Sequence, residues 1–267
     1  PGLLPAVWGG VCGAACRYLW LANGLAMIPR LGGQVKGAQE LGAQAPERAA
    51  GYGQAAFQLG ALLVILFTAM CILLNGPLIA FFRLNSPQVN SDARVSLVIV
   101  ALGFLFSFFN QIFTGLFTAM GSSVVVRRST AVGLVGNILL DPLMIFGVGP
   151  FPRMEVAGAA AATVLAQAIV TAMFLLAARR ETTLFPHIHP FRPSQGRAWL
   201  EMLRIGLPVS IPSMLFSSPS MFIARTVARG GGTPLAAQKV GHPTKSNSHH
   251  PAARSATTLH RFTSQYL

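Results

Sequence analysis

The sequence predicts an all-α membrane protein with about six spanning helices. Its 267 residues are 52% hydrophobic and only 10% charged, whereas about a quarter of the residues in soluble domains are charged. The apolar residues are gathered in runs that approach the roughly 20 residues needed to cross a bilayer as a helix. Basic residues fall between these runs and alternate in number from one connection to the next, as in proteins that obey the positive-inside rule.

Six segments are long and apolar enough to be predicted as spanning helices. They cover about residues 8–29, 54–74, 95–120, 131–149, 157–178 and 205–228. The first contains Arg17 and is closely followed by Arg30 and Lys36, so its boundaries are the least well defined. The third and fifth are the most continuous.

The distribution of cations predicts the orientation of these helices. The connections after the first, third and fifth segments contain Arg30, Lys36, Arg48, Arg127, Arg128, Arg179, Arg180, Arg192, Arg197 and Arg204. Those after the second and fourth contain only Arg83, Arg94 and Arg153. By the positive-inside rule, loops near 30–50, 121–130 and 179–204 are cytoplasmic. In a bacterium the chain would then lie in the inner membrane.

The connections themselves have turn-forming compositions. Residues 45–52 are expected to form a loop that enters the second helix, and residues 84–94 a short polar turn on the outside. The longest loop is expected at 182–197, where proline and glycine break helices. Its His187 and His189 have no neighbouring cysteine or carboxylate cluster, so they are interpreted as loop residues, and no metal site is expected.

The tail at 241–267 differs from the rest of the chain. It has no apolar period and no acidic residue, and it is rich in Ser, Thr, His and Arg. It is either a disordered basic tail or translation in a wrong reading frame, and the abrupt change of composition favours the second. The chain begins with Pro1 and no initiator methionine, which leads us to expect a fragment.

Several function classes are disfavoured by the same features. The net charge of +13 could indicate nucleic-acid binding, but the cations lie between apolar runs and form no single basic patch. An enzyme is not expected, because HExxH and GxSxG motifs are missing and no predicted span contains a histidine. Cys12, Cys16 and Cys71 are interpreted as small core residues. No cofactor is expected.

Asp141 is the main candidate functional residue. It lies in the stretch GNILLDPLMIFG, well inside an apolar run, and acids at membrane depth usually serve ions, protons or substrates. Asn137 precedes it by four residues, so both side chains share a helix face. Pro142 removes a backbone hydrogen bond beside the acid, and a bend is expected there. The alternative is that Asp141 lies near a helix end and bonds locally.

Three further polar residues lie within the third predicted span. Asn110, Gln111 and Thr114 could line a substrate cavity. Amide and hydroxyl groups also join helices to each other in membranes, at about 0.6 kcal/mol per bond. Both interpretations stay open from the sequence.

The order of several motifs resembles one family of transporters. The run GLVGNILLDPLMIFGVGPFPRMEVAGAAAATVLAQ at 133–167 is similar to the fifth and sixth helices of the multidrug and toxic compound extrusion (MATE) antiporters. QVKGAQELGAQAPERA at 34–49 resembles the end of their second helix and the following loop, and FNQIFTGLFTAMGSS at 109–123 their fourth helix. LRIGLPVSIPSMLFS at 203–217 resembles the start of the seventh. The resemblance extends over about residues 18–240.

The resemblance implies a transport function and a cation site. MATE proteins have two six-helix lobes around a cavity for amphipathic organic cations, and the N-terminal lobe in many members binds the coupling H⁺ or Na⁺. The positions that match that site are Asp141, Asn137 and Thr163. The resemblance therefore implies cation-coupled efflux of drugs or toxins. The partners would be the lipid bilayer and cationic amphipathic small molecules, with no nucleic acid and no protein partner expected.

The resemblance also implies a domain layout and two departures from the family. Residues 18–181 would be a partial N-terminal lobe (helices two to six), 182–204 the cytoplasmic inter-lobe loop and 205–240 the first helix of the C-terminal lobe, between an uncertain segment 1–17 and the tail 241–267. The family's first helix and most of its second lobe have no counterpart. Two alternatives follow: a non-transporting truncated or frameshifted fragment, or a lipid-linked oligosaccharide flippase of the same superfamily.

Overall fold

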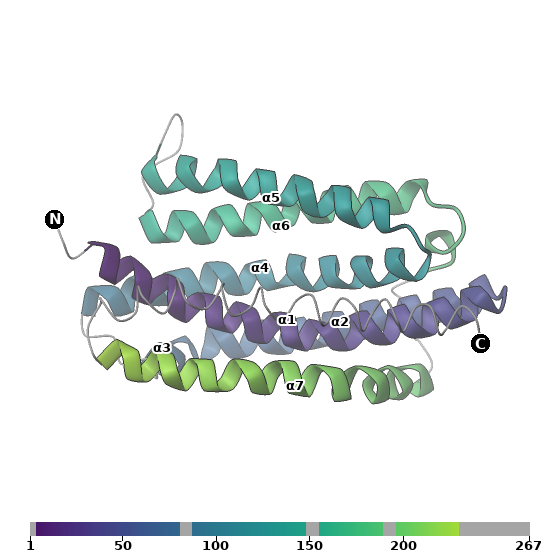
Figure 1. Cartoon of the computed structure of the whole chain (residues 1–267), viewed down its shortest axis with the longest axis horizontal. Coiled ribbons are helices and arrows are strands. Elements are labelled where there is room, and N and C mark those ends of the chain that lie inside the picture. Colours follow the sequence, from purple (N-terminus) through teal and green to yellow (C-terminus); the bar gives the residue numbers. More distant parts are fainter. Residues whose placement is uncertain (1–3, 81–86, 148–154, 189–195, 230–267) are drawn as a thin grey trace.

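The structure is a computed structural model whose described part is helical throughout (Figure 1). It describes the backbone of residues 4–80, 87–147, 155–188 and 196–229, and the side chains of 18–79, 91, 93–145, 147, 157–188 and 196–212. The elements are α1 (Leu4–Gly42), α2 (Pro46–Leu73), α3 (Asn75–Ala80), α4 (Pro87–Ala119), α5 (Ser123–Phe146), α6 (Glu155–Arg180), the 3₁₀ helix η1 (Phe185–His187) and α7 (Gly196–Arg229). The predicted all-α class is confirmed.

Four of the predicted membrane spans are recovered within the described residues. Segments Pro46–Leu73, Ala93–Ala119, Ser123–Ile145 and Ala157–Arg180 are long and apolar enough to cross a bilayer. The first and sixth predicted spans lie within α1 and α7, where many side chains are outside the described set. The chain is therefore an integral membrane protein.

The long helices lie side by side along the long axis of the molecule (Figure 1). α1 packs against α2, α4 and α7, while α6 connects α4 to α5, which packs mainly on α6. The α1–α7 pair is antiparallel, because Gly32 lies against Met202 and Gly206 lies against Ile28. The α5–α6 pair is also antiparallel, with Gly158 against the backbone of Met144 and Gly133 against Val170. These directions agree with the predicted order of spans.

Aromatic and aliphatic side chains fill the spaces around α4. Phe104 and Phe108 lie in a buried cluster with residues of α1 and α2. Further along α4, Phe113 and Phe117 stack against Phe174 of α6, with ring centroids 5.7 Å apart in each pair. Burial of each such ring stabilises the bundle because aromatic side chains have large apolar areas.

Helix α1 extends further than the sequence predicted. The span was expected to end near residue 29 and a loop to follow, but the helix continues through Pro29 to Gly42. The reason is packing against neighbouring helices: Gly32 lies against Met202, Gly33 against Ala56, and Gly37 against Ala119. Small residues let helices approach closely, which stabilises a helical segment beyond the apolar run.

Other predicted loops are also partly helical. α2 begins at Pro46, inside the loop expected at 45–52, and α5 begins at Ser123, inside the loop expected near 121–130. α4 begins at Pro87, inside the polar turn expected at 84–94, and proline is well suited to the first position of a helix. α7 begins at Gly196, inside the loop expected at 182–204. Its first turns form because Met202 is fully buried and Glu201 contacts α1 and α2.

Gly147 fixes the end of α5. Its φ of 69° is in the left-handed region, and its N–H donates to the carbonyl of Leu143. Glycine adopts this conformation without the steric cost that other residues pay. Asp141 is therefore held in the penultimate turn of α5.

The predicted tail at 241–267 lies outside the described residues, as do the side chains of the N-terminal segment 1–17. The domain boundaries proposed for the chain stay predictions.

Candidate functional site

Asp141 and Asn137 lie on the face of α5 that packs against α6. Both are half-buried. The buried residues Gly133 and Met144 contact α6, and their spacing from Asp141 places all four on one side of the helix. Leu134, Val135, Ile138 and Leu139, in contrast, are exposed. Asp141 thus lies at the edge of the α6-facing side of α5, beside its exposed side.

Thr163 lies on the opposite helix of this pair. It falls on α6 between Gly158 and Val170, which are the residues that pack against Met144 and Gly133 of α5. Its hydroxyl donates to the carbonyl of Ala159 at 3.0 Å. Among the described residues no hydrogen bond joins Thr163 to Asn137 or Asp141, so the structure places them on neighbouring helices without a bond between them.

Asn110 joins α4 to α6. Its buried amide nitrogen donates to the backbone oxygen and Oε1 of Gln167, at 3.0 and 2.8 Å. Its Oδ1 accepts from the Thr171 hydroxyl at 2.9 Å, and the Thr114 hydroxyl donates to its carbonyl at 2.7 Å. The contacts with Gln167 and Thr171 join two helices, whereas the Thr114 bond lies within α4. A cavity-lining role for Asn110 and Thr114 stays a prediction.

Gln111 belongs to a different interface. Adjacent residues of a helix point about 100° apart, and Gln111 faces α1, where its Oε1 accepts from Arg30 Nη1 at 2.7 Å. Its amide nitrogen lies 3.4 Å from Asn23 Oδ1. Of the three polar residues predicted together, Asn110 therefore bonds to α6, Gln111 to α1, and Thr114 within α4.

Sequence reasoning missed Arg30 as an interior residue. It was assigned to a cytoplasmic loop because it follows Pro29, but it lies within α1. Its Nε is buried without a hydrogen-bond partner, and no described carboxylate pairs with its guanidinium. Gly115 of α4 lies against the Arg30 backbone, which leaves little room to move the side chain.

Gln167 and Thr171 were also not predicted. The sequence does contain a pattern that indicates them. Gln167 and Thr171 are polar and four residues apart in a mainly apolar segment, so they lie on one helix face. The partner of that face could not be identified from the sequence.

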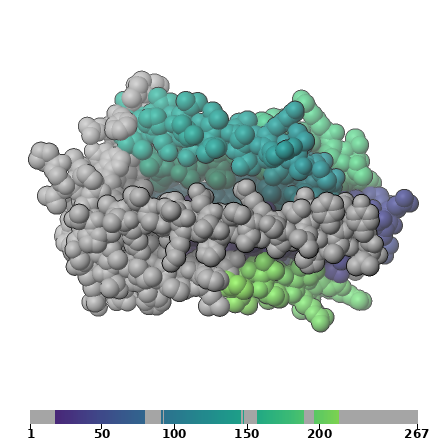
Figure 2. All heavy atoms as spheres, in the orientation of Figure 1, coloured from purple at the N-terminus to yellow at the C-terminus, as the bar shows by residue number. Residues whose placement is uncertain are grey.

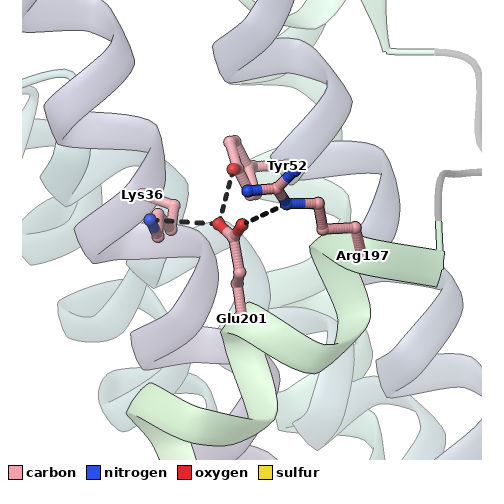
Figure 3. Close-up of polar contacts among 4 residues, drawn as sticks. All are labelled: Lys36, Tyr52, Arg197 and Glu201. Atoms are coloured by element: carbon pink, nitrogen blue, oxygen red, sulfur yellow. Dashed lines mark hydrogen bonds and ion pairs between the residues drawn. The ribbon is translucent and has the colours of Figure 1, made fainter.

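Glu201 of α7 lies at the centre of a polar cluster, at the end of the bundle that the sequence predicts to be cytoplasmic (Figure 3). Its Oε2 lies 3.0 Å from Lys36 Nζ of α1 and accepts from the Tyr52 hydroxyl of α2 at 2.7 Å. Its Oε1 lies 3.3 Å from Arg197 Nε, one turn earlier in α7. The ammonium group of Lys36 also lies 5.8 Å from the centre of the Tyr52 ring. One carboxylate thus fastens three helices together.

These donors keep Glu201 ionised. The hydrogen bond from Tyr52 and those from Lys36 and Arg197, with the charge of Lys36, lower the pKa of the carboxyl to about 2. Hydrogen bonds and cations that favour the charged form act in this direction.

A second acid holds the connection that follows α6. Partial burial raises the pKa of Glu181, but N–H groups of Leu184, Thr183 and Phe185 donate to its carboxylate and lower the pKa overall. Leu184 is fully buried, and the Phe185 ring packs 5.0 Å from that of Phe117. Residues 181–188 therefore form an ordered connection that packs against the ends of α4 and α6.

Comparison with known proteins decides the family. The family model MatE matches residues 11–143. The chain belongs to the MATE family, which is a family of transporters. This confirms the family expected from the motifs at 34–49, 109–123 and 133–167.

Curated relatives are MATE proteins of bacteria. The probable multidrug resistance protein NorM of Thermotoga maritima is 25% identical over 242 residues, which are 90% of this chain and 51% of that protein. The protein of the same name from Bacillus cereus (strain ATCC 10987) is 31% identical over 173 residues, 62% of this chain and 35% of its own length. A 27-residue stretch, 10% of the chain, is 70% identical to part of an FAD transporter of Shewanella oneidensis. The chain spans about half the length, or less, of these relatives.

Solved structures show the same fold. An inward-facing multidrug resistance MATE family transporter of the MOP superfamily superposes with a TM-score of 0.75 at 22% identity, over 87% of this chain and 54% of that one. A MATE protein in complex with MaD3S superposes with a TM-score of 0.73 at 25% identity, over 88% of this chain and 52% of that one. A MOP superfamily transporter from Pyrococcus furiosus superposes with a TM-score of 0.74 at 24% identity, over 93% of this chain and 56% of that one. The arrangement of α1 to α7 is that of MATE membrane transporters.

Proposed function

We propose that the chain acts as the N-terminal lobe of a longer MATE antiporter of the bacterial inner membrane. Entry of H⁺ or Na⁺ at Asp141 drives export of cationic amphipathic drugs or toxins. The observation that carries the proposal is the position of Asp141 and Asn137 on the α6-facing side of α5. The names of the NorM relatives, probable multidrug resistance proteins, support the cargo class.

The groups near Asp141 are suited to a proton or a small cation. The carboxylate supplies the negative charge, and the Asn137 amide oxygen is a neutral oxygen ligand of the kind that Na⁺ and other hard cations accept. The Thr163 hydroxyl donates its hydrogen bond to the carbonyl of Ala159, so the lone pairs of its oxygen remain available to a cation. Pro142 has no N–H for the carbonyl of Ile138, which adds a further free oxygen on this turn.

The test is Asp141→Asn in the complete transporter that contains this chain. The amide keeps the shape but removes the charge that takes up the proton or Na⁺. We expect cells to accumulate a fluorescent organic cation as if the transporter were missing, while its amount in the membrane is unchanged. Glu47→Gln, which removes an exposed acid in the first turn of α2, is the matched control and should retain export. Normal export by Asp141→Asn would refute the role of Asp141.

A second candidate function is transport of an anionic cargo, which Arg30 favours. Its guanidinium lies inside the bundle with a buried Nε that lacks a partner among the described residues. A flippase for lipid-linked oligosaccharides would use such a cation for the phosphate groups of its cargo. The match to part of an FAD transporter points to the same charge class.

The two candidates are separated by the cargo that each variant affects. Uptake into inverted vesicles of an organic cation and of an anionic phosphate ester is compared in wild type, Asp141→Asn and Arg30→Gln. Loss of cation flux in Asp141→Asn alone supports the antiporter. Loss of anion flux in Arg30→Gln, with no cation flux in wild type, supports the second candidate.

The fragment hypothesis has its own test. The 267-residue chain is expressed alone in the same cells. If it inserts and exports neither cargo, whereas the longer protein exports one, the chain by itself is a non-transporting product.

A further inference from the structure

Four arginines gather at one end of the α5–α6 pair. Arg127 and Arg128 lie in the second turn of α5, and Arg179 and Arg180 in the last turn of α6. α5 begins where α6 ends, because the two helices pack in antiparallel fashion. All four side chains are exposed. By the distribution of cations this end faces the cytoplasm.

These arginines differ from most cations at the same end of the bundle. Lys36 and Arg197 pair with Glu201, and Arg48 pairs with Glu40 at 3.2 Å. Within the described part of the chain no carboxylate pairs with any of the four arginines. The four arginines thus carry a charge of about +4. The one acid near them in the sequence, Glu181, uses its carboxylate to accept backbone hydrogen bonds.

The surface next to the arginines is apolar. Val124 and Val132 of α5 and Leu175 and Leu176 of α6 are 40 to 55% exposed. In the space-filling view the α5–α6 pair forms the outer edge of the molecule (Figure 2). A ligand that fits here has a negative head beside the arginines and an apolar tail along the helices.

We propose that this end of the α5–α6 pair is a docking surface for anionic phospholipids of the cytoplasmic leaflet, with phosphatidylglycerol as the model ligand. Guanidinium groups bind phosphate oxygens through paired hydrogen bonds. Clusters of four or more basic residues at the cytoplasmic ends of spanning helices bind anionic headgroups. The acyl chains would lie against the exposed valines and leucines, which a free phosphate or nucleic acid would leave uncovered.

The test measures lipid binding to the full chain in detergent micelles by native mass spectrometry. The probes are palmitoyl-oleoyl phosphatidylglycerol, the corresponding phosphatidylcholine, and inorganic phosphate. Phosphatidylglycerol should bind wild type more tightly than phosphatidylcholine. The variant R127Q/R128Q/R179Q/R180Q should lose that preference, with affinity for phosphatidylglycerol reduced by about tenfold or more. Lysine at all four positions should retain most of the preference, because the charge is kept.

Two controls make the result specific. Arg48→Gln with Arg204→Gln removes two exposed cations at the same end of the bundle and should change the preference by less than R127Q/R128Q does. Each of the double variants R127Q/R128Q and R179Q/R180Q should lose part of the preference for phosphatidylglycerol. They test the proposal if the quadruple variant does not fold.

Three results would overturn the proposal. The first is equal affinity for the two lipids in wild type. The second is an equal loss in the Arg48 and Arg204 control. The third is displacement of phosphatidylglycerol by millimolar inorganic phosphate, which would indicate a site for free anions.

Discussion

The body formed by α1, α2, α4 and α7 and the hairpin formed by α5 and α6 satisfy their side chains in different ways. In the body, buried clusters join the helices, and Lys36, Arg48 and Arg197 at the end near Glu201 are paired with acids. In the hairpin, α5 exposes most of its apolar side chains and the arginines have no described acid partner. The cations that the body pairs thus find their acids within the described chain, whereas the four arginines of the hairpin pair with no described acid.

The hairpin's own packing is the most sensitive point of this contrast. Gly158 lies so close to the Met144 backbone oxygen that a Cβ cannot fit without a backbone shift. Gly158→Ala should separate α5 from α6 and lower the free energy of unfolding by about 1 to 3 kcal/mol. Thermal unfolding in detergent, followed by circular dichroism, measures it. Gly136→Ala is the control, because its Cβ would lie 3.6 Å from Ile169; similar losses in both would show that this contact is not special.

The connection between hairpin and body should be next in importance. Asn110→Ala removes three side-chain hydrogen bonds between α4 and α6. At about 0.6 kcal/mol for each bond in a membrane, the expected loss is about 1 to 2 kcal/mol. The same unfolding assay applies. Thr114→Val is the matched control, since its hydroxyl bonds only within α4, and it should unfold close to wild type.

The smallest effect is expected in the body at Glu201. Its pKa is lowered from 4.5 to about 2 in the folded chain, so its stabilisation is present above about pH 4.5 and is lost as the pH falls toward 2. The thermal unfolding midpoint of wild type should therefore fall further than that of Glu201→Gln when the pH is lowered from 5 to 2.5. Exposed ion pairs contribute little, so the difference should be a small shift. Parallel decreases in both proteins would mean that the cluster does not contribute to stability.

The sequence predicted the hairpin better than the body. The antiparallel α5–α6 pair follows from apolar length and loop charge, and the shared helix side of Asp141 and Asn137 follows from their spacing; their role in a cation site stays a prediction. Arg30 could not be predicted, because a cation after Pro29 has the composition of a helix end. The helix continues there because Gly32, Gly33 and Gly37 pack against α7, α2 and α4, contacts that the sequence does not reveal. Gln111 and Asn110 were grouped by sequence adjacency, whereas their partners depend on which helices surround α4.

The glycines between α1 and α7 have a mechanical consequence. Gly32 receives the stem of the buried Met202, and Gly206 lies against the backbone of Ile28, so the two helices approach closely. A side chain at either glycine would push α7 away from α1 along this line of contact. Because Glu201 of the same helix reaches Lys36 and Tyr52, such a displacement would also lengthen the polar contacts at the end of α7, so that its apolar and polar contacts would be lost together.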